Sequence, residues 1–288
     1  MSRPNTRRIE RRKFLKSGVL SAGVFAAGMS RHHTLKAAEA GDAAPFPAKE
    51  ARYWEKLGDR KIRCKLCPWE CEVADKERGF CGVRENRGGT YYTLVWGRVC
   101  ALHADPIEKK PLFHFLPGTK ALSIATAGCN MECTFCQNWE LSQFRPEQLD
   151  AQDISAAQLA AIARSRSIPT IAYTYNEPVI FHEYMTDCAV EGNKRNIKSV
   201  MISNGYIKEE PLKKLCEVLA AVKVDLKAFT DRFYRKLCGG TLQPVLETLE
   251  YLKNETDTWF EITTLLIPGE NDSEGELDEL TSWVVEKL

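Results

Sequence analysis

Short apolar runs alternate with helix-type segments over residues 121–288, and this alternation constrains the fold more than any other feature of the chain. Strands are expected over residues 122–125, 170–175, 199–203, 222–226 and 259–267, and helices over 155–166, 179–195, 210–219, 241–253 and 273–288. Short apolar strands that alternate with longer helices indicate parallel βα units. A complete eight-fold barrel needs about 250 residues. The sequence therefore predicts an α/β fold in which residues 119–288 form a partial (β/α) barrel.

A loop with three cysteines directly follows the first expected strand. Cys129, Cys133 and Cys136 have the spacing C-x3-C-x2-C. Cysteine thiolates are the usual protein ligands of iron–sulfur clusters, and three thiolates on a four-iron cluster leave one iron open for a small molecule. A closed structural zinc site normally needs a fourth protein ligand. The spacing predicts a three-thiolate metal site, and the alternative interpretation is three unrelated buried cysteines or part of a zinc knuckle.

Polar and charged side chains follow the second, third and fourth expected strands. In parallel βα folds, ligand-binding residues gather at the carboxyl ends of the strands. Asp225 and Lys227 share one face of their strand, because side chains alternate with a period of two. A helix cap at Asn176 and a simple Asn-Gly turn at Asn204 are the alternatives. The candidate ligand-binding residues are Asn176, Glu177, Ser203, Asn204, Asp225 and Lys227.

Four more cysteines are clustered in the region before the barrel. The spacing C-x2-C-x3-C-x9-C joins Cys64, Cys67, Cys71 and Cys81. Four thiols close together complete a tetrahedral zinc site, and an auxiliary iron–sulfur cluster is the alternative. Residues 90–96 and 98–102 alternate like a β-hairpin around Gly97. These features predict a small Cys-rich β domain over residues 61–118.

The first forty residues are typical of a targeting segment. Arg11 and Arg12 precede a moderately apolar run over residues 17–29, and Ala38–Ala40 offers a small-x-small cleavage site. This is the layout of a signal peptide with a twin-arginine motif, and a basic tail is the alternative. The apolar run is too short to cross a bilayer, so no transmembrane helix is expected in the mature chain. The sequence predicts a twin-arginine-type signal over residues 1–40 and a linker over 41–60. Export would take the protein to the periplasm, and an unused signal would leave it in the cytoplasm.

The distribution of charge argues against a nucleic-acid partner. The formal net charge is +1, but nine Lys and Arg residues and only two Glu residues lie in residues 1–40. The rest of the chain is therefore net acidic. It has no basic patch with interleaved aromatic residues, which is the usual signature of a surface that binds phosphate backbones.

At the cysteine loop and the strand ends, the chain resembles the radical S-adenosylmethionine (SAM) superfamily. In that superfamily, the open iron chelates the amino and carboxylate groups of SAM, and one electron splits SAM into methionine and a 5′-deoxyadenosyl radical. The resemblance implies a [4Fe-4S] cluster on the three cysteines. It also implies SAM contacts from the strand-end residues, with Phe135 near the adenine. The chain departs from the family at Tyr175-Asn176-Glu177, where the superfamily has Gly-Gly-Glu.

Two stretches resemble a narrower group. The Cys-x2-Cys-Pro-x2-Cys run that leads to Cys81-Gly82-Val83-Arg84, and the stretch Asp105–Pro111, look like the radical SAM member of the AmmeMemoRadiSam system. That group is related to the pyruvate formate-lyase activating enzymes. The resembled barrel has six strands, whereas five βα units are visible here. We therefore expect the last strand to be missing.

The resemblance implies an enzyme that cleaves SAM reductively and abstracts hydrogen from an unknown substrate. It also implies an external reductant such as a flavodoxin or ferredoxin. An activase that installs a glycyl radical on a partner protein is one alternative, and a non-catalytic iron–sulfur electron carrier is another. No residue for the hydrogen-abstraction step is identifiable from the sequence.

Overall fold

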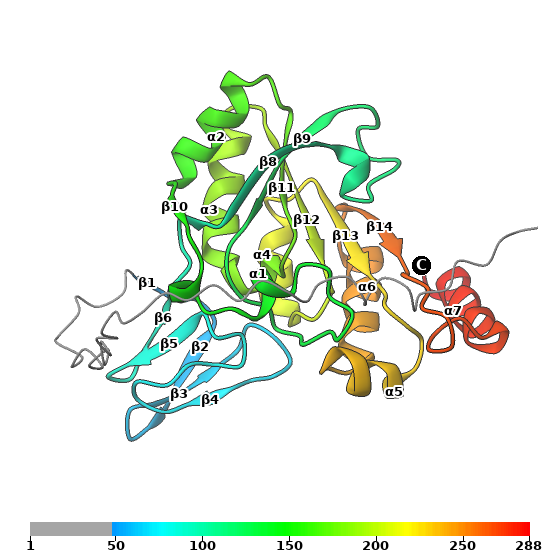
Figure 1. Ribbon diagram of the computed structural model, residues 1–288, viewed down its shortest axis with the longest axis horizontal. Coiled ribbons are helices and arrows are strands. Elements are labelled where there is room, and N and C mark those ends of the chain that lie inside the picture. Colours follow the sequence, from blue (N-terminus) through cyan, green and yellow to red (C-terminus); the bar gives the residue numbers. More distant parts are fainter. Residues whose placement is uncertain (1–47) are drawn as a thin grey trace, which may run out of the picture. The chain divides into compact units, whose positions relative to one another are not determined.

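A computed structural model describes residues 48–288, so the signal segment predicted for residues 1–40 lies outside the described residues. Its central feature is a six-stranded sheet with the order β14-β13-β12-β11-β9-β8 (Figure 1). Five neighbouring strands are parallel: β9 (Lys120–Ala125), β11 (Thr170–Tyr173), β12 (Lys198–Ser203), β13 (Ala221–Asp225) and β14 (Trp259–Thr263). The predicted α/β fold is confirmed, and all five expected strands form.

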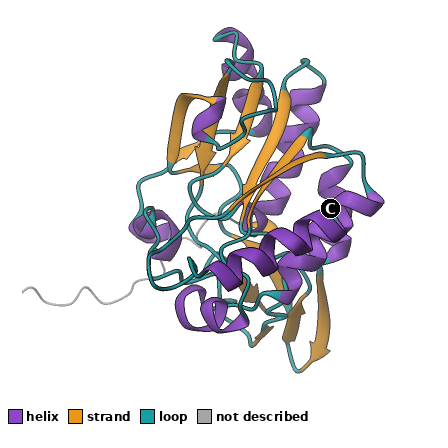
Figure 2. Cartoon of the chain, turned by 90° about the vertical axis from the view of Figure 1, so that its right-hand side faces the viewer, coloured by secondary structure: helices purple, strands orange, loops and turns teal. Residues whose placement is uncertain are grey.

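Helices follow the parallel strands along the chain and cover the sheet. Figure 2 draws the helices in purple and the strands in orange. They are α2 (Ala156–Ser165), α3 (His182–Asn193), α4 (Glu209–Cys216), α6 (Gln243–Glu255) and α7 (Glu274–Lys287). Ser155 caps α2 in two ways. Its hydroxyl accepts from the Gln158 backbone N–H, and its own backbone N–H donates to the Gln158 side chain. None of the helices within residues 48–288 is long and apolar enough to span a membrane.

The β-hairpin predicted around Gly97 is wrong. Its first arm, β6 (Thr90–Thr93), pairs with β5 (Arg84–Arg87) and β1 (Lys49–Glu50). Its second arm divides into β7 (Arg98–Val99), which pairs with β10 (Gln152–Asp153), and β8 (Ala101–Pro106). Strand β8 lies antiparallel to β9 and covers that edge of the barrel sheet. Strands form within both predicted arms, but the sequence does not reveal which sheet each strand joins.

The linker predicted for residues 41–60 is also wrong in its described part. Besides β1, it contains β2 (Trp54–Gly58), which pairs with β3 (Lys61–Cys64), and β3 pairs with β4 (Glu72–Val73). Strand β2 is mostly exposed. Because it buries few side chains, it lacks the apolar residues that distinguish a strand from a linker in the sequence. Because β8 belongs to the barrel sheet, the region predicted as a small domain over residues 61–118 also contributes to the barrel.

Candidate active site

The cysteine loop and the carboxyl ends of the strands line one cavity of about 700 Å³. Its lining includes all ten residues predicted to hold a cluster or SAM: Cys129, Cys133, Phe135, Cys136, Asn176, Glu177, Ser203, Asn204, Asp225 and Lys227. The parallel register explains this convergence, since neighbouring strands present their carboxyl ends at the same edge of the sheet. The structure thus brings the predicted residues together, while their individual roles remain predictions.

The cysteine loop is held in place by a segment that the sequence did not reveal. After β13 come α5 (Asp231–Phe233) and a π-helical turn, η4 (Tyr234–Cys238). The backbone N–H groups of Glu132 and Thr134 donate to the carbonyls of Cys238 (2.8 Å) and Leu237 (2.9 Å). Short π-helical turns are rare and occur often at functional sites. These two hydrogen bonds hold the loop on both sides of Cys133.

The thiols of the loop differ in their surroundings. Burial raises the pKa of the Cys129 thiol. By contrast, a hydrogen bond from the buried Cys238 thiol lowers the pKa of Cys133, which favours the thiolate that a metal requires. Within residues 48–288, no three His, Cys, Asp or Glu side chains are arranged to hold a single metal ion. A cubane does not need such convergence, because each thiolate binds a different iron.

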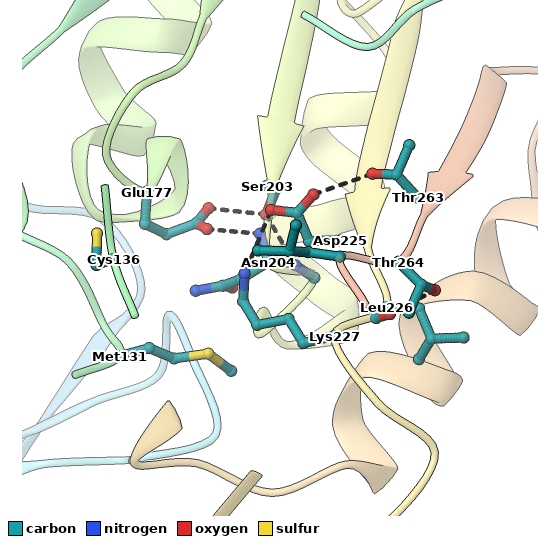
Figure 3. Close-up of polar contacts among 12 residues, drawn as sticks. Met131, Cys136, Glu177, Ser203, Asn204, Asp225, Leu226, Lys227, Thr263 and Thr264 are labelled. Atoms are coloured by element: carbon teal, nitrogen blue, oxygen red, sulfur yellow. Dashed lines mark hydrogen bonds and ion pairs between the residues drawn. The ribbon is translucent and has the colours of Figure 1, made fainter. Parts of the chain in front are cut away.

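Glu177 links the ends of two strands inside the cavity (Figure 3). Its carboxylate accepts from the Ser203 hydroxyl (2.7 Å), the Asn204 backbone N–H (2.7 Å) and the Val179 backbone N–H (3.0 Å). The last contact caps the 3-10 turn η3 (Pro178–Phe181). Burial raises the pKa of Glu177, which these donors oppose. The hydroxyl proton of Ser203 is therefore directed at Glu177, so Ser203 orients the carboxylate.

Two asparagines connect the strand ends to the cysteine loop. The Asn204 side chain donates to Asn130 Oδ1 (2.9 Å), and Asn176 Nδ2 donates to the Gly128 carbonyl (2.8 Å). Asn176 Oδ1 is buried and has no hydrogen-bond partner within the described residues. An unpaired buried acceptor is costly, so this oxygen suits a ligand that carries N–H donors. SAM has an ammonium group of this kind, so the acceptor at Asn176 fits this cofactor. Asn130 was not among the predicted residues, because an asparagine between two cysteines carries no spacing signal.

A row of charged side chains lies along β13 on the other side of the cavity. Asp225 accepts from the Lys227 ammonium (3.3 Å) and from the Thr263 hydroxyl (3.2 Å) (Figure 3). It also forms an ion pair with Lys223, whose side chain is 5% exposed. The predicted pairing of Asp225 and Lys227 is present. Lys223 was missed, although the same two-residue period that links Asp225 to Lys227 also places Lys223 on this face.

The stretch Asp105–Pro111 reaches the same cavity from β8 and the 3-10 turn η1 (Ile107–Lys109). The Asp105 carboxylate accepts from the Lys110 ammonium (2.8 Å) and from the Tyr175 hydroxyl (2.6 Å). Burial alone would raise the pKa of Asp105, but these donors hold it below its usual range. The Lys110 ammonium also lies 4.3 Å from the centre of the Tyr175 ring. These side chains form the wall of the cavity at the β8 edge of the sheet.

Tyr175 has the left-handed backbone conformation that usually favours glycine, with φ of 71°. In the alignment of Tyr175-Asn176-Glu177 with Gly-Gly-Glu, Tyr175 lies at the first glycine. A bulky residue in this conformation carries backbone strain. We expect Tyr175→Gly to be more stable than Tyr175→Ala by about 1 kcal/mol, because only alanine keeps the strained Cβ. Urea unfolding of both variants measures this difference.

The same pair of substitutions at Tyr251 provides the control. Tyr251 lies within helix α6, where glycine is less stable than alanine by about 1 kcal/mol. The order of stability should therefore reverse between the two sites. An alanine variant of Tyr175 as stable as the glycine variant would show that the backbone there is not strained.

Of the four cysteines Cys64, Cys67, Cys71 and Cys81, the last lies against the start of the cysteine loop. Cys64 and Cys67 are buried, and the Cys81 carbonyl would be 2.8 Å from a Cβ added at Gly128. The thiols are not arranged as a closed site for one ion in the part of the chain that the structure describes. Neither zinc nor a second cluster is therefore shown, and both remain predictions.

Three thiols on a loop and polar side chains at the ends of parallel strands are the arrangement of a cofactor-dependent barrel enzyme. The model of the Radical SAM superfamily matches residues 123–281. The uncharacterized protein MJ0808 of Methanocaldococcus jannaschii is 43% identical over 240 residues, which cover 83% of this chain and 71% of the relative. The chain therefore belongs to the radical SAM superfamily. Members of this superfamily are enzymes that use a [4Fe-4S] cluster and SAM.

Two solved structures share part of this fold. TYW1 with a lysine-pyruvate adduct bound is 19% identical, with a TM-score of 0.44, over 60% of this chain and 64% of that chain. SuiB of Streptococcus suis bound to S-adenosylmethionine is 18% identical, with a TM-score of 0.46, over 58% of this chain and 38% of that chain. The chain thus spans less than two thirds of either structure. The narrower resemblance to the AmmeMemoRadiSam system stays a prediction.

Proposed function

We propose that this protein uses a [4Fe-4S] cluster on Cys129, Cys133 and Cys136 to cleave SAM reductively and abstract hydrogen from a substrate in the cavity. The observation that carries this proposal is that the three thiols and the polar strand ends line the same cavity. A pure electron carrier gains nothing from an incompletely ligated iron beside such a cavity. Bound together, the cluster and SAM would supply a 5′-deoxyadenosyl radical.

The residues of the chain would bind and orient SAM. The unpaired Oδ1 of Asn176 and the fixed carboxylate of Glu177 would attract the ammonium group. Lys227 and Asp225 offer a donor and an acceptor on the opposite wall, and Phe135 offers an aromatic face. The carboxylate of Glu177 is already oriented by three donors, so binding would require little rearrangement.

Two further elements belong to the proposal. A one-electron donor such as a flavodoxin or ferredoxin would reduce the cluster, because no residue of the cavity supplies a low-potential electron. The signal segment predicted for residues 1–40 would direct the folded protein to the periplasm where that signal is used.

The test is anaerobic reconstitution of the full chain with iron and sulfide, followed by dithionite and SAM. We expect the wild type to form 5′-deoxyadenosine and Cys133→Ala to form none, because one iron loses its thiolate. Cys216→Ala is the matched control: Cys216 is a partly exposed cysteine at the end of α4, outside the cavity lining. If a fully loaded wild-type cluster neither binds nor cleaves SAM, the proposal is wrong.

A further inference from the structure

A side recess of about 400 Å³ adjoins the main cavity between β13 and β14. The two spaces share Phe135, Asp225 and Lys227 in their linings. Lys223 and Thr263 line only the recess. The recess is therefore a space beside the proposed SAM site, and it contains a charged residue, Lys223, that does not line the main cavity.

The recess carries more positive than negative charge. Lys223 and Lys227 both form ion pairs with Asp225, which is the only acidic partner of either lysine within residues 48–288. The Thr263 hydroxyl also donates to this carboxylate. Each ammonium group has three N–H donors, so one shared carboxylate leaves several of them without an acceptor.

Burial makes this imbalance important at Lys223. The residue is 4% exposed, so water does not readily solvate its ammonium group. Burial and the charge of Lys227 lower the pKa of Lys223, whereas the carboxylate of Asp225 favours its charged form. A buried charge is costly unless it is paired and hydrogen-bonded. A second anion beside Lys223 would remove this cost.

The acidic residue opposite Lys223 is engaged elsewhere. Glu261 is its partner in the register between β13 and β14. However, the Glu261 carboxylate accepts from the backbone N–H groups of Phe113 (2.8 Å), His114 (3.1 Å) and Phe115 (3.0 Å). These contacts hold Glu261 against the loop that follows η1. Asp225, which Lys223 shares with Lys227, is therefore the acidic group that remains for Lys223.

We propose that this recess binds an anionic group of the substrate, a carboxylate or a phosphate, with Lys223 as its charged anchor. This inference rests on the proposed function, which assigns the SAM contacts to Asn176, Glu177, Asp225, Lys227 and Phe135 and leaves Lys223 for the substrate. The apolar part of such a substrate would contact Pro111 and Leu265, which also line the recess.

The experiment measures the affinity of inorganic phosphate and of propionate for the reconstituted full chain saturated with SAM, by titration calorimetry at constant ionic strength. We expect saturable binding of at least one anion, weakened about tenfold or more in Lys223→Met, because a charged hydrogen bond is lost. Lys223→Arg keeps the charge and should retain most of the affinity. Lys198→Met is the matched control, since Lys198 is an exposed lysine at the start of β12.

A separate titration with SAM alone distinguishes the two proposals. Unchanged SAM affinity in Lys223→Met, with weakened anion binding, supports a substrate subsite. Three results would overturn it: no saturable binding of either anion, equal anion affinity in Lys223→Met and wild type, or displacement of the anion by SAM. Failure of the wild type to bind SAM contradicts the proposed function itself. The anion titration repeated without SAM then decides whether Lys223 still anchors an anion.

Discussion

Replacing Glu183 by alanine is expected to lower the free energy of unfolding by about 3–5 kcal/mol, because it leaves a buried guanidinium without its partner. Glu183 and Arg84 each have 1% of their side-chain surface exposed, and their charged groups are 2.5 Å apart. Glu183 also accepts from the Arg52 backbone N–H (2.6 Å). The pair joins α3 of the barrel to strand β5, which belongs to the three-stranded sheet β1-β6-β5. Urea unfolding monitored by circular dichroism measures the loss.

Two controls separate the buried charge from general effects of mutation. Glu191→Ala, on the same helix but in surface ion pairs with Lys194 and Arg195, should cost less than about 1 kcal/mol. The double variant Arg84→Met/Glu183→Leu should recover much of the loss, because neither charge remains buried alone. A loss in Glu183→Ala no larger than that in Glu191→Ala would contradict the argument.

The same pair predicts a dependence of stability on pH. Burial by itself would raise the pKa of Glu183, but the charge of Arg84 outweighs this and holds it below the usual value. The stabilisation is therefore fully present above the unfolded-state pKa of about 4.3. It decreases as the pH falls through the lower pKa of the folded state. Wild type and Glu183→Ala should accordingly converge in stability at acidic pH.

The second large effect is expected for Gly128→Ala, which should cost about 2–4 kcal/mol and prevent normal loading of the cluster. Gly128 has φ of +93°, and an added Cβ would lie 2.5 Å from Val83 Cγ1 and 2.8 Å from the Cys81 carbonyl oxygen. Backbone strain and overpacking both contribute. Because Cys129 is the next residue, the clash moves a cluster ligand. Iron and sulfide content after reconstitution, together with thermal unfolding, measures both effects.

Gly118→Ala is the matched control for Gly128→Ala. Gly118 has φ of +76°, but nothing lies within 4 Å of an added Cβ, so only backbone strain of about 1 kcal/mol is expected. Cluster loading should be normal in this variant. Adding Val83→Ala to Gly128→Ala should restore part of the stability. Full cluster loading in Gly128→Ala would show that the small sheets do not constrain the cysteine loop.

Much of the barrel was predictable because its signals are local. The five parallel strands are short apolar runs, and the cap of α2 at Ser155 is a side-chain contact between near neighbours. The same holds for the site: strand ends of a parallel sheet converge whatever the details of packing, so Glu177, Asn204 and Asp225 were identifiable before their contacts were known.

The parts that were not predictable depend on contacts distant in sequence. Strand β8 has no pattern of its own that marks it as part of the barrel, and only its pairing with β9 assigns it there. The turn η4 has no distinctive composition, yet its carbonyls hold the cysteine loop about a hundred residues earlier in the chain. Lys223 is the exception. It was not predicted, although the period of two places it on the same face as Asp225. That signal is local and was sufficient to include Lys223 among the candidates.

The contacts of Glu177 have a consequence for how this site tolerates change during evolution. One carboxylate fastens the end of β11 to the end of β12 and also faces the cavity. Selection for a stable fold and selection for chemistry therefore act on the same side chain. A descendant that lost its catalytic role would still be expected to keep Glu177. The presence of this residue in a related sequence is consequently weaker evidence of activity than the presence of the three cysteines.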